Sequence, residues 1–276
     1  MLRPVITFLT DFGPDSAAAI CRGVILGISR DAQIVDISHS VRKFAIRDGA
    51  WLLWISVPHM PIGFHVAVVD PGVGTARRPI GIRSGRGDVF VGPDNGLLVP
   101  AAERLDGIVE VRALENRSLM LPRTTSTFHG RDIFAPVATH LANGVAFEEI
   151  GPEVDPASVV RLTFPEPSIG AGLLETTIVY VDSFGNLRLA GEPADLEAAL
   201  GTLGSGARLT AEFAPQDGRP AIHETVTWQR TFGEVEQGRP LLYEDSFGRL
   251  ALADNQASIA ARLGLSVDRV VRLRPS

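Results

Sequence analysis

The chain has 276 residues, 45% of them hydrophobic and 21% charged, which is typical of a folded protein with one large or two modest domains. Its 26 basic and 32 acidic residues give a net charge of −6, and no run of like charge occurs along the chain. This balance argues against nucleic acid or an anionic membrane as the main partner.

No segment predicts export or membrane insertion. The apolar run at 5–9 is too short for a signal peptide, and Asp11 follows it closely. Residues 49–63 are too short and too interrupted by proline to span a bilayer. The single cysteine, Cys21, cannot form an internal disulfide and is expected to pack as a small hydrophobic residue. The sequence therefore predicts a soluble, cytoplasmic protein.

The first part of the chain alternates predicted strands and helices. Strands are predicted where short β-branched runs are bounded by turn residues, at 5–9, 33–38, 64–70, 80–84 and 107–113. Helices are predicted at 15–31, with Asp15 or Ser16 as N-cap, at 45–57, and at 130–144. This alternation predicts an α/β domain built on a mostly parallel sheet.

The composition changes after residue 150. Residues 151–172 are rich in proline and glycine. Beyond them, hairpin-like strands are predicted at 173–190, 207–213, 224–232 and 248–254. We therefore expect two domains, an α/β domain over residues 1–165 and a smaller β-rich domain over residues 166–276. The sequence Asp-Ser-Phe-Gly occurs twice in the second domain, at 182–185 and 245–248, which two similar hairpin turns would explain.

A turn rich in polar and small residues follows the apolar strand at 64–70. Asp70 is expected at the carboxyl end of this strand, where open α/β sheets bind ligands. Gly72 and Gly74 allow positive φ or close approach to a ligand, and Arg77 follows within reach. The turn therefore suits a small polar ligand held between a carboxylate and a guanidinium, or a tight surface turn closed by an ion pair. Its spacing matches neither a Walker loop nor a dinucleotide fingerprint.

Further polar segments lie at the ends of predicted elements, at 10–16, 91–96 and 126–132. Among the histidines, His129 has the setting that best suits a functional imidazole, although a structural histidine is the simpler interpretation. Asp132 would suit the first turn of a helix, and Asp94 and Asn95 would suit a turn.

Two enzyme classes can be weighed on these residues. A metal hydrolase could use a set of carboxylates and one imidazole, namely Asp70, Asp94, His129 and Asp132. A protein kinase is excluded, because the Asp-Phe-Gly segment at 11–13 comes far too early for the order of kinase motifs.

Taken together, several segments resemble a known enzyme family. They are ITFLTDFG, IVDISHSV, HVAVVDPGVGTARR, VGPDNGLL, STFHGRDIFAPVATHLANG and VDSFGN, in this order. They are similar to segments of the S-adenosylmethionine (SAM) hydrolases that form adenosine, also called SAM hydroxide adenosyltransferases, which are related to fluorinase and chlorinase. The resemblance covers nearly the whole chain. It implies an N-terminal α/β domain, a C-terminal barrel-like β domain, and a homotrimer with sites between subunits.

The resemblance also implies roles for individual residues. The family's water-activating group falls on Asp70, Arg77 and His129. Positions matching its substrate contacts are Asp11 for ribose, Ser16, Asp182 and Ser246 for the methionine part, Asn186 for adenine, and Phe44 and Phe184 as apolar walls. The chain departs from the pattern on the methionine side. It lacks bulky residues after Ser16, and it has Phe247 where halogenase relatives have an arginine.

The implied reaction is hydrolysis of SAM to adenosine and L-methionine, with water as the nucleophile at C5′ and no metal ion or other cofactor. Two alternatives belong to other classes, a SAM or adenosine sensor without catalysis and a SAM-dependent halogenase. An ionised carboxylate at Asp70 would repel a halide ion, which disfavours the halogenase.

Overall fold

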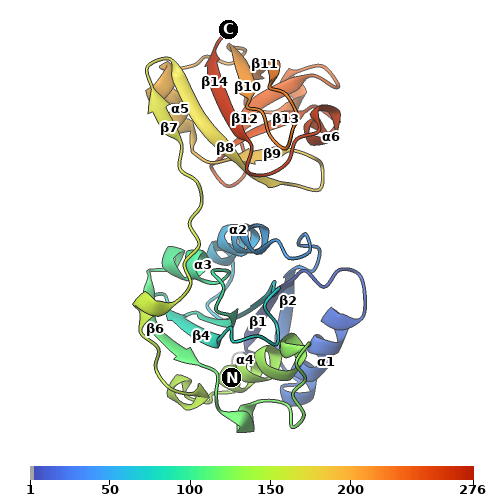
Figure 1. Cartoon of the computed structure of the whole chain (residues 1–276), viewed down its shortest axis with the longest axis vertical. Helices are drawn as coiled ribbons and strands as arrows, with labels where there is room; N and C mark the ends of the chain where they lie inside the picture. The colour runs from blue at the N-terminus through green and yellow to red at the C-terminus, as the bar shows by residue number, and fades with distance from the viewer. Residues whose placement is uncertain (1–2) are drawn as a thin grey trace. The chain divides into compact units, whose positions relative to one another are not determined.

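The computed structural model describes residues 3–276, which form two compact units (Figure 1). The first ends at Thr163, and the second runs from Phe164 to Ser276. In the described part of the chain, none of the helices has the length and apolar character needed to cross a membrane.

The first unit is built on a six-stranded sheet with the order β2-β1-β3-β5-β4-β6. The strands are β1 (Val5–Thr10), β2 (Gln33–Ser38), β3 (Phe64–Val68), β4 (Pro79–Ser84), β5 (Val89–Pro93) and β6 (Ile108–Ala113). The neighbours among β2, β1, β3 and β5 pair in parallel, and β4 alone runs antiparallel to its neighbours β5 and β6. The predicted α/β fold with a mostly parallel sheet is confirmed.

Helices cover both faces of this sheet (Figure 1). One face carries α1 (Ala17–Ile28) and α4 (Ala135–Ala142), and the other carries α2 (Ile46–Ser56) and α3 (Val99–Arg104). Because alternate strand residues face opposite sides, Ile6 and Phe8 of β1 pack with Cys21 of α1 in one core. Cys21 is completely buried there, as the sequence predicted. Ser16 occupies the N-cap of α1, but its side chain makes no capping hydrogen bond.

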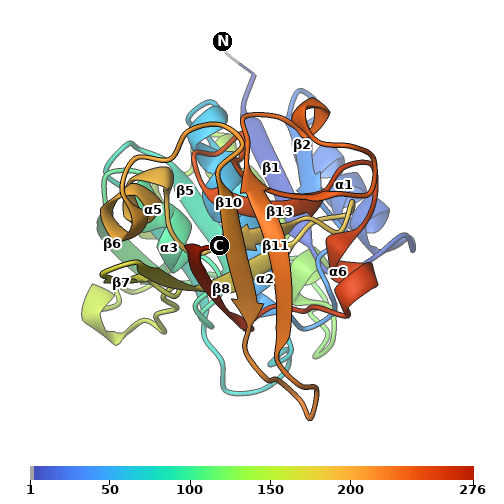
Figure 2. The same cartoon turned by 90° about the horizontal axis from the view of Figure 1, so that it is seen from above.

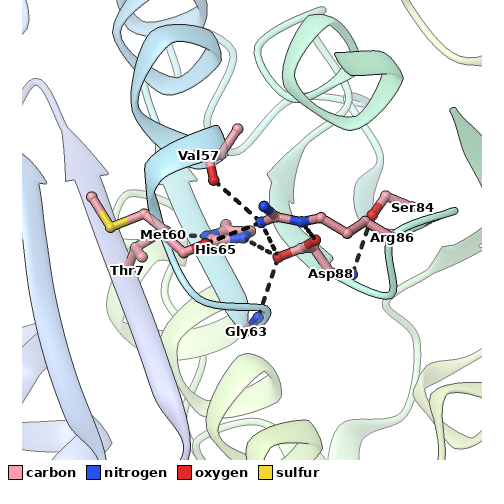
Figure 3. A network of polar contacts seen from close by, with 8 residues as sticks. All are labelled: Thr7, Val57, Met60, Gly63, His65, Ser84, Arg86 and Asp88. Atoms are coloured by element: carbon pink, nitrogen blue, oxygen red, sulfur yellow. Dashed lines mark hydrogen bonds and ion pairs between the residues drawn. The ribbon is translucent and has the colours of Figure 1, made fainter. Parts of the chain in front are cut away.

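A buried polar network links β1 and β3 to the segment that leads into β5 (Figure 3). Thr7 Oγ1 lies 2.8 Å from His65 Nδ1, and His65 Nε2 lies 2.9 Å from Asp88 Oδ1. Arg86 donates to both oxygens of Asp88, at 2.7 and 3.0 Å, and to two backbone carbonyls after α2. Burial would raise the pKa of Asp88, but the hydrogen bonds from His65 and Arg86 outweigh it and hold that pKa well below its usual range.

The second unit is a seven-stranded barrel. Its strand order is β14-β10-β11-β12-β13-β9-β8, and the pairing of β14 with β8 closes it, while β7 extends beyond β8. The strands are β7 (Ser168–Gly170), β8 (Leu173–Val181), β9 (Leu187–Leu189), β10 (Arg208–Phe213), β11 (Ile222–Trp228), β12 (Pro240–Glu244), β13 (Leu250–Asp254) and β14 (Val270–Pro275). Figure 2 shows β10 and β11 as a long antiparallel hairpin. Two short helices, α5 (Pro193–Leu200) and α6 (Ile259–Leu263), complete the unit.

The repeated Asp-Ser-Phe-Gly segments are hairpin turns, as predicted. One joins β8 to β9 and the other joins β12 to β13, and β9 pairs with β13. In each turn the aspartate Oδ1 accepts the backbone amides two and four residues later, at 2.9 and 3.0 Å for Asp182 and at 2.8 and 3.0 Å for Asp245. The two turns are therefore alike in hydrogen bonding as well as in sequence.

Candidate active site

Asp70 and Arg77 form an ion pair just beyond the carboxyl end of β3. Arg77 Nε donates to Asp70 Oδ1 at 3.1 Å, and Arg77 Nη2 donates to Asp70 Oδ2. The two side chains are only 5% and 7% exposed, so this forked pair is largely shielded from solvent screening. Of the two interpretations that the sequence allowed, a ligand held between the two groups or a surface turn closed by an ion pair, the structure shows the ion pair, and it is buried.

The turn between these residues packs against the loop that carries His129. Gly74 has a φ of +78°, and a Cβ atom at this position would lie 2.4 Å from the carbonyl oxygen of Ser126. Only glycine allows both this conformation and this close approach. The Thr75 hydroxyl accepts the backbone amide of Arg77 at 3.3 Å, which closes the end of the turn.

His129 directly precedes a short π-helical segment, Gly130–Phe134. Asp132 in this segment is completely buried and accepts the backbone amide and the hydroxyl of Thr125, both at 2.7 Å, and Arg131 Nε at 2.5 Å. Burial would raise the pKa of Asp132, but the hydrogen bonds from Arg131 and Thr125 outweigh it and lower that pKa. The charged carboxylate thus anchors the loop before His129.

Arg77 connects the ion pair to His129. Arg77 Nη2 lies 3.0 Å from His129 Nδ1, and because a guanidinium can only donate, Nδ1 accepts and carries no hydrogen. Burial, together with the charge of Arg77, lowers the pKa of His129 below its ordinary value. His129 is therefore neutral at pH 7, with its hydrogen on Nε2. The structure brings Asp70, Arg77 and His129 together.

Asp70 and His129 line a small cavity of about 90 Å³ beside the ends of β1 and β3. The cavity is also lined by Asp11, Phe12, Phe44, Val68, Val73, Thr127, Phe128 and Gly130. Asp11 Oδ2 accepts the backbone amide of Phe44 at 2.9 Å, and the side chain of Phe44 is left 69% exposed. Of the residues predicted in this unit, Arg77 and Ser16 do not line this cavity. Arg77 contacts both Asp70 and His129, and Ser16 lies exposed at the start of α1.

A larger cavity of about 890 Å³ lies in the second unit, beside the two Asp-Ser-Phe-Gly turns. All residues predicted in this unit line it, namely Asp182, Phe184, Asn186 and Ser246. Asn186 Nδ2 donates to Asp182 Oδ2 at 3.0 Å, so the amide orientation is set by the carboxylate. Phe184 is 76% exposed and leaves its ring free for a ligand.

Comparison with known protein families matches both units. Residues 6–151 match the model of the SAM hydroxide adenosyltransferase N-terminal domain, and residues 176–272 match that of the C-terminal domain. The chain belongs to the SAM hydroxide adenosyltransferase family.

Two related enzymes and one solved structure align with nearly the whole chain of this family member. An (R)-S-adenosyl-L-methionine hydrolase from Salinispora tropica is 39% identical over 95% of each chain. A fluorinase from Actinopolyspora mzabensis is 28% identical over 99% of this chain and 98% of the fluorinase. The crystal structure of an uncharacterized conserved protein from Thermotoga maritima superposes with a TM-score of 0.87 at 30% identity, over 98% and 99% of the two chains.

Some residues that line the second cavity were not predicted from the sequence. Arg188 lines the cavity and forms an ion pair with the Asp245 carboxylate. Arg188 Nη2 lies 3.7 Å from Asp182 Oδ2. The guanidinium carbon of Arg188 lies 5.0 Å from the centre of the Phe247 ring. Burial raises the pKa of Tyr243, which also lines the cavity, to about 12, so it stays a neutral phenol. Arg188 could have been singled out in the sequence because it is a charged residue between two leucines of a short strand.

Two of the carboxylates considered for a metal hydrolase, Asp94 and Asp132, bind other partners in this member of the SAM hydroxide adenosyltransferase family. Asp94 accepts Arg78 Nε at 2.9 Å and the Val160 amide at 2.8 Å. Asp132 is occupied by its loop contacts. Within residues 3–276, no three side chains of the types that bind metals are grouped so as to hold an ion.

Proposed function

We propose that this chain hydrolyses SAM to adenosine and L-methionine. The observation that carries the proposal is the shielded ion pair of Asp70 and Arg77 in contact with His129 and beside Asp11, in a chain 39% identical to a SAM hydrolase. The sulfonium of SAM is an excellent leaving group. The C5′ carbon therefore needs only a nucleophile held in line with the C–S bond.

In this mechanism Asp70 and His129 hold the attacking water. The Nε2 hydrogen of His129 points to the water oxygen, because Nδ1 already accepts from Arg77. Asp70 accepts one water hydrogen and takes the proton as the new O–C5′ bond forms. The electron pair of the C–S bond leaves on sulfur, which yields neutral methionine. Arg77 holds the carboxylate in place and stabilises negative charge as the water becomes hydroxide-like.

The substrate is bound by groups of both units. The vicinal ribose hydroxyls suit the carboxylate of Asp11 as a common acceptor. The exposed rings of Phe44 and Phe184 supply apolar walls for adenine, and the Asn186 amide supplies a hydrogen bond to it. The methionine part contacts Ser16, Asp182 and Ser246. The resemblance to the family implies a homotrimer in which neighbouring subunits complete each site, and we propose this arrangement for the present chain.

A turnover assay tests the proposed function. Purified chain is incubated with the (R) and (S) sulfonium epimers of SAM separately, with and without a chelator, and products are resolved by chromatography. We expect equal amounts of adenosine and L-methionine, with no effect of the chelator. The relative from Salinispora tropica is an (R)-S-adenosyl-L-methionine hydrolase, so the (R) epimer is the first substrate to test. Tight binding of SAM without turnover would instead support a sensor, and loss of turnover with chelator would support a metal hydrolase.

The fluorinase relative makes halide chemistry the second candidate. A halide ion must enter a desolvated site, and the ionised Asp70 would repel it there. We therefore expect no 5′-halo-adenosine when fluoride or chloride is supplied in excess. Its formation at a rate comparable to hydrolysis would overturn the role given to Asp70.

A further inference from the structure

A chain of polar contacts begins at the backbone that flanks Asp11. The amide of Phe12 donates to Thr10 Oγ1 at 3.2 Å, and Thr10 Oγ1 lies 2.9 Å from His39 Nδ1. His39 Nε2 lies 3.0 Å from Asp36 Oδ1. These contacts connect the end of β1, where the cavity lies, to the end of β2.

One direction of donation suits the contact between Thr10 and His39. The Thr10 hydroxyl has a single hydrogen, and since its oxygen already accepts the Phe12 amide, it can donate that hydrogen to His39 Nδ1. The remaining imidazole hydrogen is then on Nε2, which lies 3.0 Å from Asp36 Oδ1 without a well-directed hydrogen bond to it. Thr10 is completely buried and the His39 side chain is 15% exposed, so water does not readily replace these contacts.

His39 also holds the other side of the same loop. Its backbone carbonyl accepts the amide of Gly13 at 2.7 Å, and its ring packs edge-on against Phe8 with centroids 5.0 Å apart. The main chain before and after Asp11 is thus tied to His39, through Thr10 on one side and through Gly13 on the other.

We infer that His39 is a positioning residue, whose side chain acts through Thr10 to orient the carboxylate of Asp11. The inference rests on the proposed function, in which this carboxylate binds the two ribose hydroxyls. Two hydrogen bonds to one carboxylate need a defined direction, and a small displacement of the loop weakens both. His39 touches neither the substrate nor the water-activating group in this scheme.

The same strand offers a matched control. Thr7, three residues earlier, bonds His65, which bonds Asp88, in contacts of the same chemistry (Figure 3). His65 and Asp88 are completely buried, and none of these residues lines the cavity at Asp11. Removing either threonine hydroxyl leaves an imidazole nitrogen unsatisfied, but only Thr10 bonds the Asp11 loop.

The test compares binding of adenosine and of 2′,3′-dideoxyadenosine to the full-length chain by calorimetry. The ratio of the two dissociation constants isolates the contact between Asp11 and the hydroxyls. We expect the wild-type chain to bind adenosine at least about tenfold more tightly, the loss that follows from removing hydrogen bonds to a charged group. Thr10→Val and His39→Ala should reduce this preference to less than about threefold. They should also raise the KM for SAM more than they lower kcat.

Thr10→Ser should restore the preference, because it keeps the hydroxyl. Thr7→Val should lower Tm by a few degrees and keep the wild-type preference. A preference that survives in both Thr10→Val and His39→Ala, with Tm alone reduced, would overturn the inference. Equal affinities for the two nucleosides in the wild-type chain would contradict the proposed role of Asp11 itself, and with it the inference, so the two failures are distinguishable.

Discussion

The guanidinium of Arg77 donates hydrogen bonds to two partners, to both carboxylate oxygens of Asp70 and to Nδ1 of His129. We expect Asp70→Ala or Arg77→Ala to lower the turnover of SAM by roughly 10²-fold or more without abolishing SAM binding. The first variant lacks the carboxylate that accepts the proton of the water, and the second lacks the guanidinium that holds this carboxylate in place. Steady-state kinetics and calorimetric binding check this. Arg78→Ala is the matched control, because Arg78 is 39% exposed and pairs with Asp94 instead. Near-normal turnover in both Asp70→Ala and Arg77→Ala would show that this turn takes no part in the reaction.

The neutral state of His129 predicts a pH dependence. Burial and the charge of Arg77 lower its pKa, so the imidazole stays neutral below its ordinary pKa. We expect kcat/KM to hold level down to about pH 6.5 and the loss due to His129 protonation to come only at lower pH. His129→Asn keeps an N–H donor and should retain more turnover than His129→Ala. A fall in kcat/KM centred above the ordinary histidine pKa, and absent from His129→Asn, would contradict this assignment.

At the scale of elements, the buried network of Figure 3 ties β1 and β3, through Asp88, to the segment that leads into β5. We expect Asp88→Asn to lower the free energy of unfolding by about 3–5 kcal/mol at pH 7, because Arg86 and His65 lose their charged partner. The pKa of Asp88 is lowered in the folded state, so its contribution is present above the ordinary aspartate pKa and is lost as the pH falls. The stability difference between wild type and Asp88→Asn should therefore shrink below about pH 4.

Urea unfolding at several pH values measures this difference. Glu148→Gln is the control, because Glu148 pairs with Arg83 at the surface with its side chain 57% exposed and should contribute little. Equal losses for Asp88→Asn and Glu148→Gln would show that the buried network does not hold the strands together.

At the scale of the whole molecule, the proposed trimer predicts complementation. Asp70→Ala and Asn186→Ala damage different units, and each is expected to be nearly inactive alone. If neighbouring subunits share each site, mixed trimers contain some interfaces in which both halves are intact. Co-refolding the two variants should then give activity clearly above the sum of the parents. The particle mass should be near three times 29.5 kDa. Proven subunit mixing without a gain in activity, or a monomeric mass, would reject the shared site.

Hydrophobic periodicity and turn residues located most strands and helices of the first unit, because these signals are local. They did not assign short elements such as α3, β7 and α6, which have too few residues to show a period. The pairing of β11 with β12 is parallel and was not predicted, because strand direction depends on the closure of the barrel rather than on the strand itself.

The sequence by itself determined the alternation of strands and helices and placed Asp70 and Arg77 seven residues apart in one turn after β3. It allowed either a ligand between the two groups or an ion pair, and the structure shows the ion pair. The setting of His129 and the resemblance both indicated this residue, but the tertiary structure decided its contact with Arg77 across 52 residues. The contact forms because a loop anchored by Asp132 meets the turn at Gly74. The tertiary structure also decided that Asp11 joins Asp70, since neighbouring parallel strands end at the same edge of the sheet. The contact of Thr10 with His39 has the same origin, because no local pattern records which side chains meet when two strands end side by side.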